Sequence, residues 1–150
     1  MLEKYFNFFS KHIFLMVFFL PSSGCVSIPK FASLDVESTY QVATEKYARY
    51  MRWGYIKDAA GFSRAKDGSN ISHDLNDARK YRVSNYKILN RMLSDNGFEG
   101  RVLAIVEYYH IDSGVLRHLE LEQSWWFDHL NRRWYLSGPL PRFSDGLGDE

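Results

Sequence analysis

The sequence holds a single cysteine, Cys25, among its 150 residues. An intrachain disulfide is therefore excluded, and burial of apolar side chains has to stabilise the fold. Neither sign of charge dominates: Lys and Arg total 19, Asp and Glu total 18, and outside the first 24 residues the two classes are equal in number. This balance argues against a dedicated nucleic-acid surface, which carries a strong basic excess.

Long hydrophobic runs, internal repeats and low-complexity tracts are also missing. The apolar run at residues 13–20 is too short to cross a hydrocarbon core of ~30 Å as a helix. Lys4 and Lys11 precede this run, and Pro21 and three small residues follow it. A charged start, a short apolar centre and a small-residue exit predict an export signal peptide over residues 1–24.

Cys25 directly follows Gly24 at the end of the predicted signal. This arrangement resembles the cleavage site of bacterial lipoproteins, in which the cysteine receives a diacylglyceryl group and begins the mature chain. The resemblance implies a lipid bilayer as partner through acylated Cys25, because each buried methylene contributes about 0.8 kcal/mol. Val26 stands where an aspartate marks inner-membrane retention, so the resemblance implies the outer membrane, facing the periplasm. An ordinary signal followed by a free or buried thiol is the alternative.

Helical patterns fill the first part of the remaining chain. Ser33, followed by Asp35 and Glu37, is typical of a helix start, because a hydroxyl caps the first backbone N–H groups and carboxylates suit the positive end of the dipole. Apolar residues then recur every three or four positions as far as Gly54, which we expect to end the helix. A second short helix is predicted from Ile56 to near Gly61, a polar loop at 63–70 and a third short helix within 73–79.

The period changes after residue 80. Segments 81–93, 101–111, 115–127 and 133–136 are rich in β-branched and aromatic residues and are separated by short turn signals, which predicts an antiparallel meander. A two-residue turn at Ser113-Gly114 would place Val102 opposite Trp125 and Val106 opposite Leu121 on one apolar face. The register of the first hairpin stays open. The predicted fold is α+β, with N-terminal helices packed on a curved sheet of about four strands.

The other face of the central hairpin carries the candidate chemistry. In the same register Glu107 lies opposite Glu120, with Tyr109 opposite His118 and Ile105 opposite Glu122. Alternate positions bring His118, Glu120 and Glu122 to one side of a strand, as a ligand or metal site would require. Facing carboxylates could instead share a proton for acid–base catalysis. The competing interpretation is a solvated sheet face, which tolerates like charges because water screens them.

Other polar and aromatic residues give weaker signals. His73-Asp74 and His110 lack a nucleophile placed beside them, so they do not indicate a triad. Aromatic pairs could stack a sugar, although such residues more often fill the space between sheet and helix, and neighbours in a strand point to opposite faces. Three arginines could meet lipid phosphates or be ordinary surface charge. These pairs and arginines are Trp125-Trp126 and Trp134-Tyr135, and Arg52, Arg132 and Arg133.

One further resemblance involves most of the globular part, roughly residues 40–143. The run Tyr-Ala-Arg-Tyr-Met-Arg-Trp-Gly-Tyr at 47–55 is followed by Ala59-Ala60, and later by Gln-Ser-Trp at 123–125 and Trp-Tyr-Leu at 134–136. Together these motifs resemble small Gram-negative lipoproteins with the nuclear transport factor 2-like fold. The resemblance implies a cystatin-like α+β domain.

These observations predict a signal peptide at 1–24, a lipidated cysteine and short tether at 25–33, one domain at 34–143 and a flexible tail at 144–150. The expected function is a membrane-anchored envelope lipoprotein whose non-enzymatic domain binds an envelope protein or a small apolar ligand. The alternative is a small hydrolase or isomerase that uses Glu107, His118 and Glu120 in a pocket. No catalytic residue, cofactor or resident metal is assigned, and no nucleic-acid partner is expected.

Overall fold

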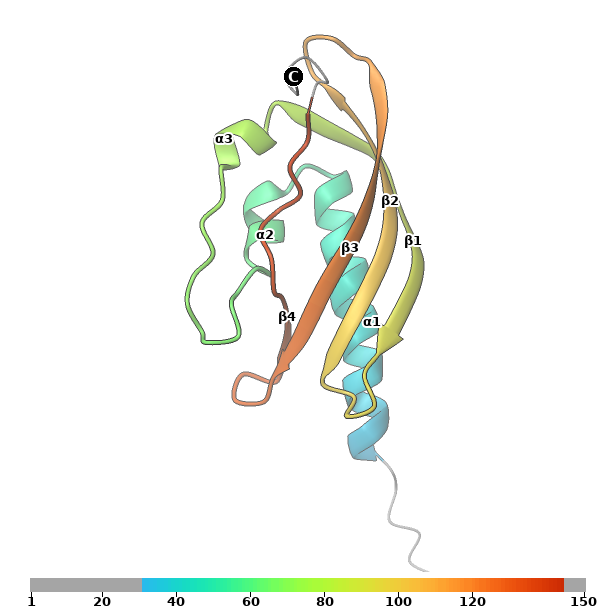
Figure 1. The fold of residues 1–150 in the computed structure, drawn as a ribbon, viewed down its shortest axis with the longest axis vertical. Coiled ribbons are helices and arrows are strands. Elements are labelled where there is room, and N and C mark those ends of the chain that lie inside the picture. Colours follow the sequence, from blue (N-terminus) through green and yellow to red (C-terminus); the bar gives the residue numbers. More distant parts are fainter. Residues whose placement is uncertain (1–30, 145–150) are drawn as a thin grey trace, which may run out of the picture.

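The computed structural model describes residues 31–144, with residues 31–35 described by their backbone alone. Cys25, the predicted signal and nearly all of the predicted tail lie outside the described residues. The order of elements is α1 (Phe31–Arg52), α2 (Ile56–Ala60), α3 (Leu75–Ala78), β1 (Tyr81–Leu93), β2 (Glu99–His110), β3 (Leu116–Asp128) and β4 (Arg133–Leu136). The strands form one antiparallel sheet in the order β1-β2-β3-β4 (Figure 1). The predicted α+β class and four-stranded meander are confirmed.

The long helix α1 ends where the sequence predicts. Gly54 adopts a left-handed backbone with φ of 71°, which costs a residue without a Cβ little. The N–H of Tyr55 donates to the carbonyl of Tyr50 at 2.9 Å and that of Gly54 to Met51 at 3.3 Å, so the last carbonyls are satisfied in a Schellman arrangement. At the other end α1 begins at Phe31, so Ser33 lies within the helix and the first turn holds no carboxylate; the predicted cap at Ser33 is wrong.

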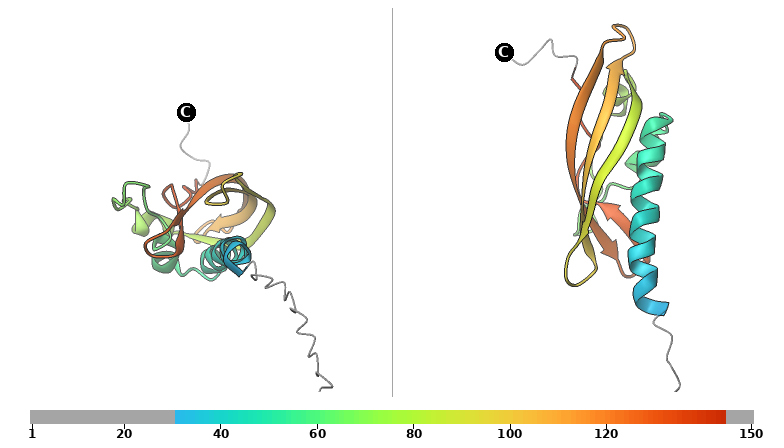
Figure 2. Two further views of the ribbon diagram at one scale, coloured as in Figure 1. Left: turned by 90° about the horizontal axis from the view of Figure 1, so that it is seen from below. Right: turned by 90° about the vertical axis from the view of Figure 1, so that its right-hand side faces the viewer.

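One stripe of α1 packs on the sheet, as Figure 2 shows in its right-hand view. Tyr47 is completely buried, and its ring meets Trp125 edge-on with ring centres 5.6 Å apart. Tyr86 and Phe62 also meet the ring of Tyr47 edge-on, with ring centres 6.2 and 6.1 Å away. Val106 is also fully buried, and Leu121 and Tyr50 pack partly buried against the same core. The predicted common core of helix stripe and apolar sheet face is confirmed.

The register of the first hairpin is irregular. The pairing of β1 with β2 shifts twice by one residue, between Val83 and Asn85 and between Ile88 and Asn90. Each shift is an extra residue in β1, which bends and twists the strand. No constant offset therefore pairs the two strands along their whole length.

The predicted register of the central hairpin is wrong by two residues. Glu107 lies opposite His118, not Glu120, and Val102 lies opposite Gln123, not Trp125. The connection is longer than a two-residue turn, because the N–H of Gly114 bonds the carbonyl of His110 at 2.9 Å and closes a wider loop. A displacement by two preserves which face each side chain occupies, because side chains alternate with a period of two. The predicted faces therefore hold while the predicted partners do not.

Loop and tail segments complete the sheet. The segment after α2 runs beside the edge of β4, where Arg64 N–H donates to the carbonyl of Leu136 at 2.9 Å and Leu136 N–H donates to Phe62 at 2.7 Å. After β4 the chain returns across the sheet, and Phe143 packs on Tyr108 with ring centres 4.6 Å apart. Within residues 31–144, no helix has the length and apolar character needed to cross a membrane.

Candidate functional site

The predicted polar group lies on the sheet face turned away from α1, which we call the outer face. Glu107 and His118 are direct neighbours there, with 3.5 Å between Glu107 Oε1 and His118 Nε2. The imidazole is 63% exposed and the carboxylate 33%. A pair so open to water cannot desolvate a reactant, and desolvation is what shifts catalytic groups from their ordinary behaviour. The pair can act as a surface hydrogen-bonding or ionic contact.

The remaining carboxylates of the group do not converge on His118. Glu120 lies opposite Ile105, so the predicted carboxylate pair with Glu107 does not form. Glu122 lies opposite Leu103 and approaches Arg101 at 3.4 Å. Same-face neighbours along a strand are roughly 6.6 Å apart at ~3.3 Å per residue, which spreads three alternate residues over about 13 Å. Across residues 31–144, no group of three or more His, Cys, Asp or Glu side chains is arranged to hold a metal ion.

The other two histidines singled out by the sequence have structural surroundings. His73 Nδ1 accepts a hydrogen bond from the backbone N–H of Leu140 at 3.3 Å, and partial burial lowers the pKa of its imidazole. The Asp74 carboxylate caps α3 by accepting the N–H groups of Asn76 and Asp77. His110 lies edge-on to the ring of Tyr81 at 5.2 Å. These contacts position the short helix, the tail segment and the end of β2.

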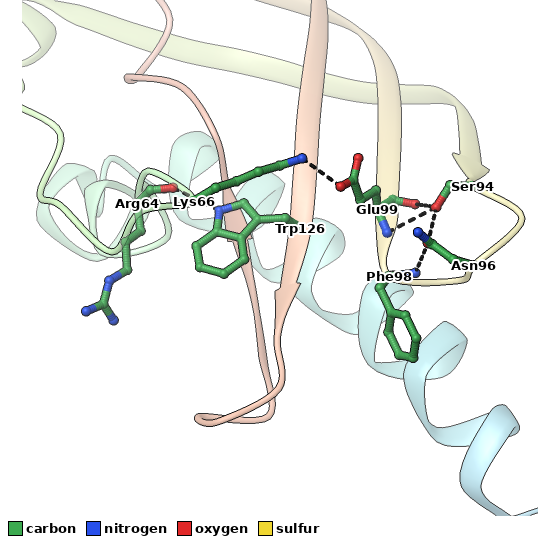
Figure 3. Close-up of polar contacts among 7 residues, drawn as sticks. All are labelled: Arg64, Lys66, Ser94, Asn96, Phe98, Glu99 and Trp126. Atoms are coloured by element: carbon green, nitrogen blue, oxygen red, sulfur yellow. Dashed lines mark hydrogen bonds and ion pairs between the residues drawn. The ribbon is translucent and has the colours of Figure 1, made fainter.

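The aromatic pairs divide between core and surface as strand alternation requires. Trp125 and Trp134 are each only 1% exposed, so neither offers a stacking face. Trp126 is half-buried on the outer side and donates its indole N–H to the carbonyl of Arg64 at 2.9 Å (Figure 3). Tyr135 packs beside Trp126 at 5.5 Å and has Arg64 and Arg133 guanidinium groups over its ring. Trp126 and Tyr135 therefore anchor the loop after α2 and do not form an open platform for a sugar.

A polar cleft that the sequence did not predict lies where this loop meets the sheet. Lys66 Nζ reaches Glu99 Oε1 at 2.7 Å, as Figure 3 shows, and joins the loop to the start of β2. Ser94 Oγ holds the same strand end by donating to the Glu99 carbonyl at 3.0 Å and accepting its N–H at 3.2 Å. The cleft has a volume of about 450 Å³ and is also lined by Arg101, Ser124 and Ser137. Lys66 and Glu99 are 33 positions apart, so no local pattern indicates their contact.

A second, more apolar groove of about 500 Å³ opens between β3 and the segment that follows β4. Its lining includes Leu121, Gln123, Leu136, Leu140 and Arg142. Gln123 is 7% exposed, and its side-chain oxygen accepts the Tyr86 hydroxyl at 3.1 Å. Burial raises the pKa of Tyr86, so this hydroxyl stays protonated and donating at neutral pH. The groove could hold a small apolar ligand with one amide contact.

Comparisons with known proteins assign no family. No protein-family model matches the chain, and no curated protein matches it. A solved structure with a similar chain path is the solution structure of a SEC-C motif containing protein from Rhodopseudomonas palustris. The two chains share 15% identity with a TM-score of 0.44, over 68% of this chain and 74% of that chain.

Proposed function

We propose that this protein is a lipoprotein of the bacterial cell envelope, anchored by acylated Cys25 in the outer membrane and facing the periplasm. Its nuclear transport factor 2-like α+β domain acts by binding an envelope protein and catalyses no reaction. The observation that carries the anchor is the position of the only cysteine directly after a charged, apolar and small-residue leader. Acyl chains on that cysteine would hold the domain at a bilayer.

The outer face of the sheet supports a binding role. Leu103 in the middle of β2 is 37% exposed and Met92, diagonally across on β1, is 47% exposed. Charged residues lie beside them, because Arg101 is paired with Met92 and Glu122 with Leu103. Apolar side chains within a polar surround are the usual composition of a non-obligate protein interface. A protein partner is favoured over a ligand held inside the core, because aromatic rings already fill the space between α1 and the sheet.

A hydrolase or isomerase built on Glu107, His118 and Glu120 is the weaker candidate. The contact between His118 and Glu107 at 3.5 Å favours it, since a carboxylate can orient an imidazole base. Against it stand the exposure of the pair and the position of Glu120 opposite an isoleucine.

Membrane fractionation tests the anchor. In a Gram-negative host the unsubstituted chain should sediment with outer membranes, and mass spectrometry should find Cys25 acylated at the mature N-terminus. Cys25→Ser should leave the chain unprocessed or soluble. Val26→Asp keeps the cysteine and, by the resemblance, should move the protein to the inner-membrane fraction. A processed, tightly bound Cys25→Ser protein would end the proposal.

Site-specific photo-crosslinking in cells tests the binding role. A crosslinking residue at position 103 should yield a discrete protein adduct. The same residue at position 67, in the loop after α2, is the control and should yield none. Leu103→Glu combined with a crosslinker at position 92 should abolish the adduct if one surface is used. Absence of an adduct at both outer-face positions would contradict binding through this face.

A further inference from the structure

The domain exposes apolar side chains at both ends of its long axis. The β1–β2 and β3–β4 turns lie at one end and the β2–β3 connection at the other (Figure 1). At one end, the β1–β2 turn holds Phe98, which is 37% exposed, and the β3–β4 turn holds Leu130, which is 96% exposed. At the other end, Val115 in the β2–β3 connection and Leu116 at the start of β3 are 54% and 52% exposed. Helix α1 begins at the end that carries the β3–β4 turn.

The exposure of Leu130 is built into its turn. Asp128 Oδ1 accepts the backbone N–H of Leu130 at 2.9 Å and that of Asn131 at 3.1 Å, and Asp128 Oδ2 accepts the side-chain amide of Asn131 at 2.7 Å. Arg132 then adopts a left-handed backbone with φ of 50°. These contacts fix the turn with its apolar tip directed away from the core.

Aromatic contacts join this turn to its neighbour. The ring of His129 meets that of Phe98 at 4.3 Å, and both contact Phe127. We call the exposed residues Phe98, His129 and Leu130 the basal surface. The first turns of α1 are tied to the same end of the sheet, because the indole N–H of Trp134 in β4 donates to the carbonyl of Val36 at 3.2 Å.

Chain length decides which end can meet a bilayer. Six peptide steps separate Cys25 from the first residue of α1, and at ~3.5 Å per step they reach about 20 Å at most. Helix α1 has 22 residues and is about 33 Å long at ~1.5 Å per residue. If the opposite end touched the membrane, the start of α1 would stand farther above it than the tether can span. An anchor at Cys25 therefore excludes an orientation in which the domain stands on the end that carries Leu116.

Charge does not draw the near end to an anionic surface. Asp95 lies in the β1–β2 turn, Asp128 ends β3, and Glu37 is exposed in the first turns of α1, whereas Arg132 and Arg133 supply the positive charge beside the β3–β4 turn. Lipid contact at this end therefore depends on the apolar side chains and on the acyl chains.

We infer that the basal surface rests on the phospholipid interface, with Leu130 inserted among the headgroups and Phe98 beside it. The inference rests on the proposed acylation of Cys25 and adds the orientation of the domain. Helix α1 and the strands extend from the bilayer into the periplasm, and the β2–β3 connection lies farthest from the membrane. A single inserted leucine is a weak anchor by itself. Because the acyl chains already hold the domain at the membrane, insertion of Leu130 is an intramolecular step with a high effective lipid concentration.

Depth-dependent fluorescence quenching tests this orientation in the full chain. The protein is produced in a Gram-negative host as Leu130→Cys and, separately, as Leu116→Cys, then placed in unilamellar vesicles of phosphatidylethanolamine and phosphatidylglycerol. Because acylation blocks the thiol of Cys25, the introduced thiol alone takes an environment-sensitive maleimide dye. Both positions are exposed leucines, so they form a matched pair. Circular dichroism and melting temperature confirm that each variant folds.

Brominated lipids should quench the dye at position 130 several-fold more than the dye at position 116, and its emission should shift to the blue. Equal quenching, or stronger quenching at position 116, would overturn the inference while leaving the lipid anchor intact. The unsubstituted chain separates the two proposals: if it takes up dye at Cys25, the thiol is free, and the anchor and the orientation fall together.

Discussion

The ring of Tyr40 in α1 fills the space above Gly100 in β2, where a Cβ atom would lie 2.6 Å from the Tyr40 Cζ atom. The Tyr40 hydroxyl donates to the carbonyl of Arg101 at 2.9 Å, which holds the ring in place. Burial raises the pKa of Tyr40 to about 12, so the hydroxyl remains a donor at neutral pH. The close approach of helix to sheet at this point depends on a residue without a side chain.

Gly100→Ala should therefore lower the free energy of unfolding by about 1–3 kcal/mol, the usual cost of overpacking. Gly138→Ala is the matched control, because a Cβ there meets no atom within 4 Å, and it should change stability by less than about 0.5 kcal/mol. Urea unfolding followed by fluorescence measures both. Equal effects would show that α1 can move away from β2 freely.

Trp125 and Trp126 are neighbours on opposite faces and should differ in their contribution to stability. Trp125→Ala removes a side chain that is 1% exposed and packed against Tyr47, and should cost about 3–5 kcal/mol. Trp126→Ala removes a half-buried side chain and one hydrogen bond, and should cost clearly less. Chemical denaturation with calorimetry compares the two, and an equal or reversed ranking would mean that the assignment of faces is wrong.

The β3–β4 turn should show a pH dependence that comes from Asp128. Hydrogen bonds from the side chain and backbone of Asn131 lower the pKa of this carboxyl in the folded state. Its stabilising contribution is therefore fully present above the unfolded value of about 3.9 and is lost as pH falls through the lowered folded value. Asp128→Asn should reduce the drop in melting temperature between neutral and strongly acidic pH. Asp95→Asn in the other turn is the control, and an identical pH profile for the wild type and Asp128→Asn would contradict this assignment.

The outer-face pair should be nearly neutral for stability and should bind no metal. In a double-mutant cycle, Glu107→Gln and His118→Gln should show a coupling below about 1 kcal/mol, as exposed ion pairs do. Glu120→Gln should change stability little, because its opposite residue is Ile105. Calorimetric titration with zinc should give no stoichiometric binding. Tight binding that His118→Ala abolishes would instead favour the enzyme or metal alternative.

Much of the fold could be predicted from local patterns because local physical chemistry decides them. The left-handed residue after α1 had to suit a glycine, and the predicted bounds of β1 and β4 coincide with the observed strands. The assignment of faces on β2 and β3 also held, because burying Val102 and Trp125 requires alternation and nothing more. Lipid attachment at Cys25 stays a prediction, since that residue lies outside the described range.

What the sequence alone determined is composition and period: a balanced charge, a helix stripe and four alternating strands. Pairing partners were decided by the tertiary structure, because two extra residues in β1 and a wider β2–β3 loop shift strands without changing any local pattern. That shift replaced a predicted Glu107–Glu120 pair with a Glu107–His118 contact. Likewise, the Lys66–Glu99 ion pair and the packing of Phe98 on His129 join segments distant in sequence, and only the folded chain brings them together.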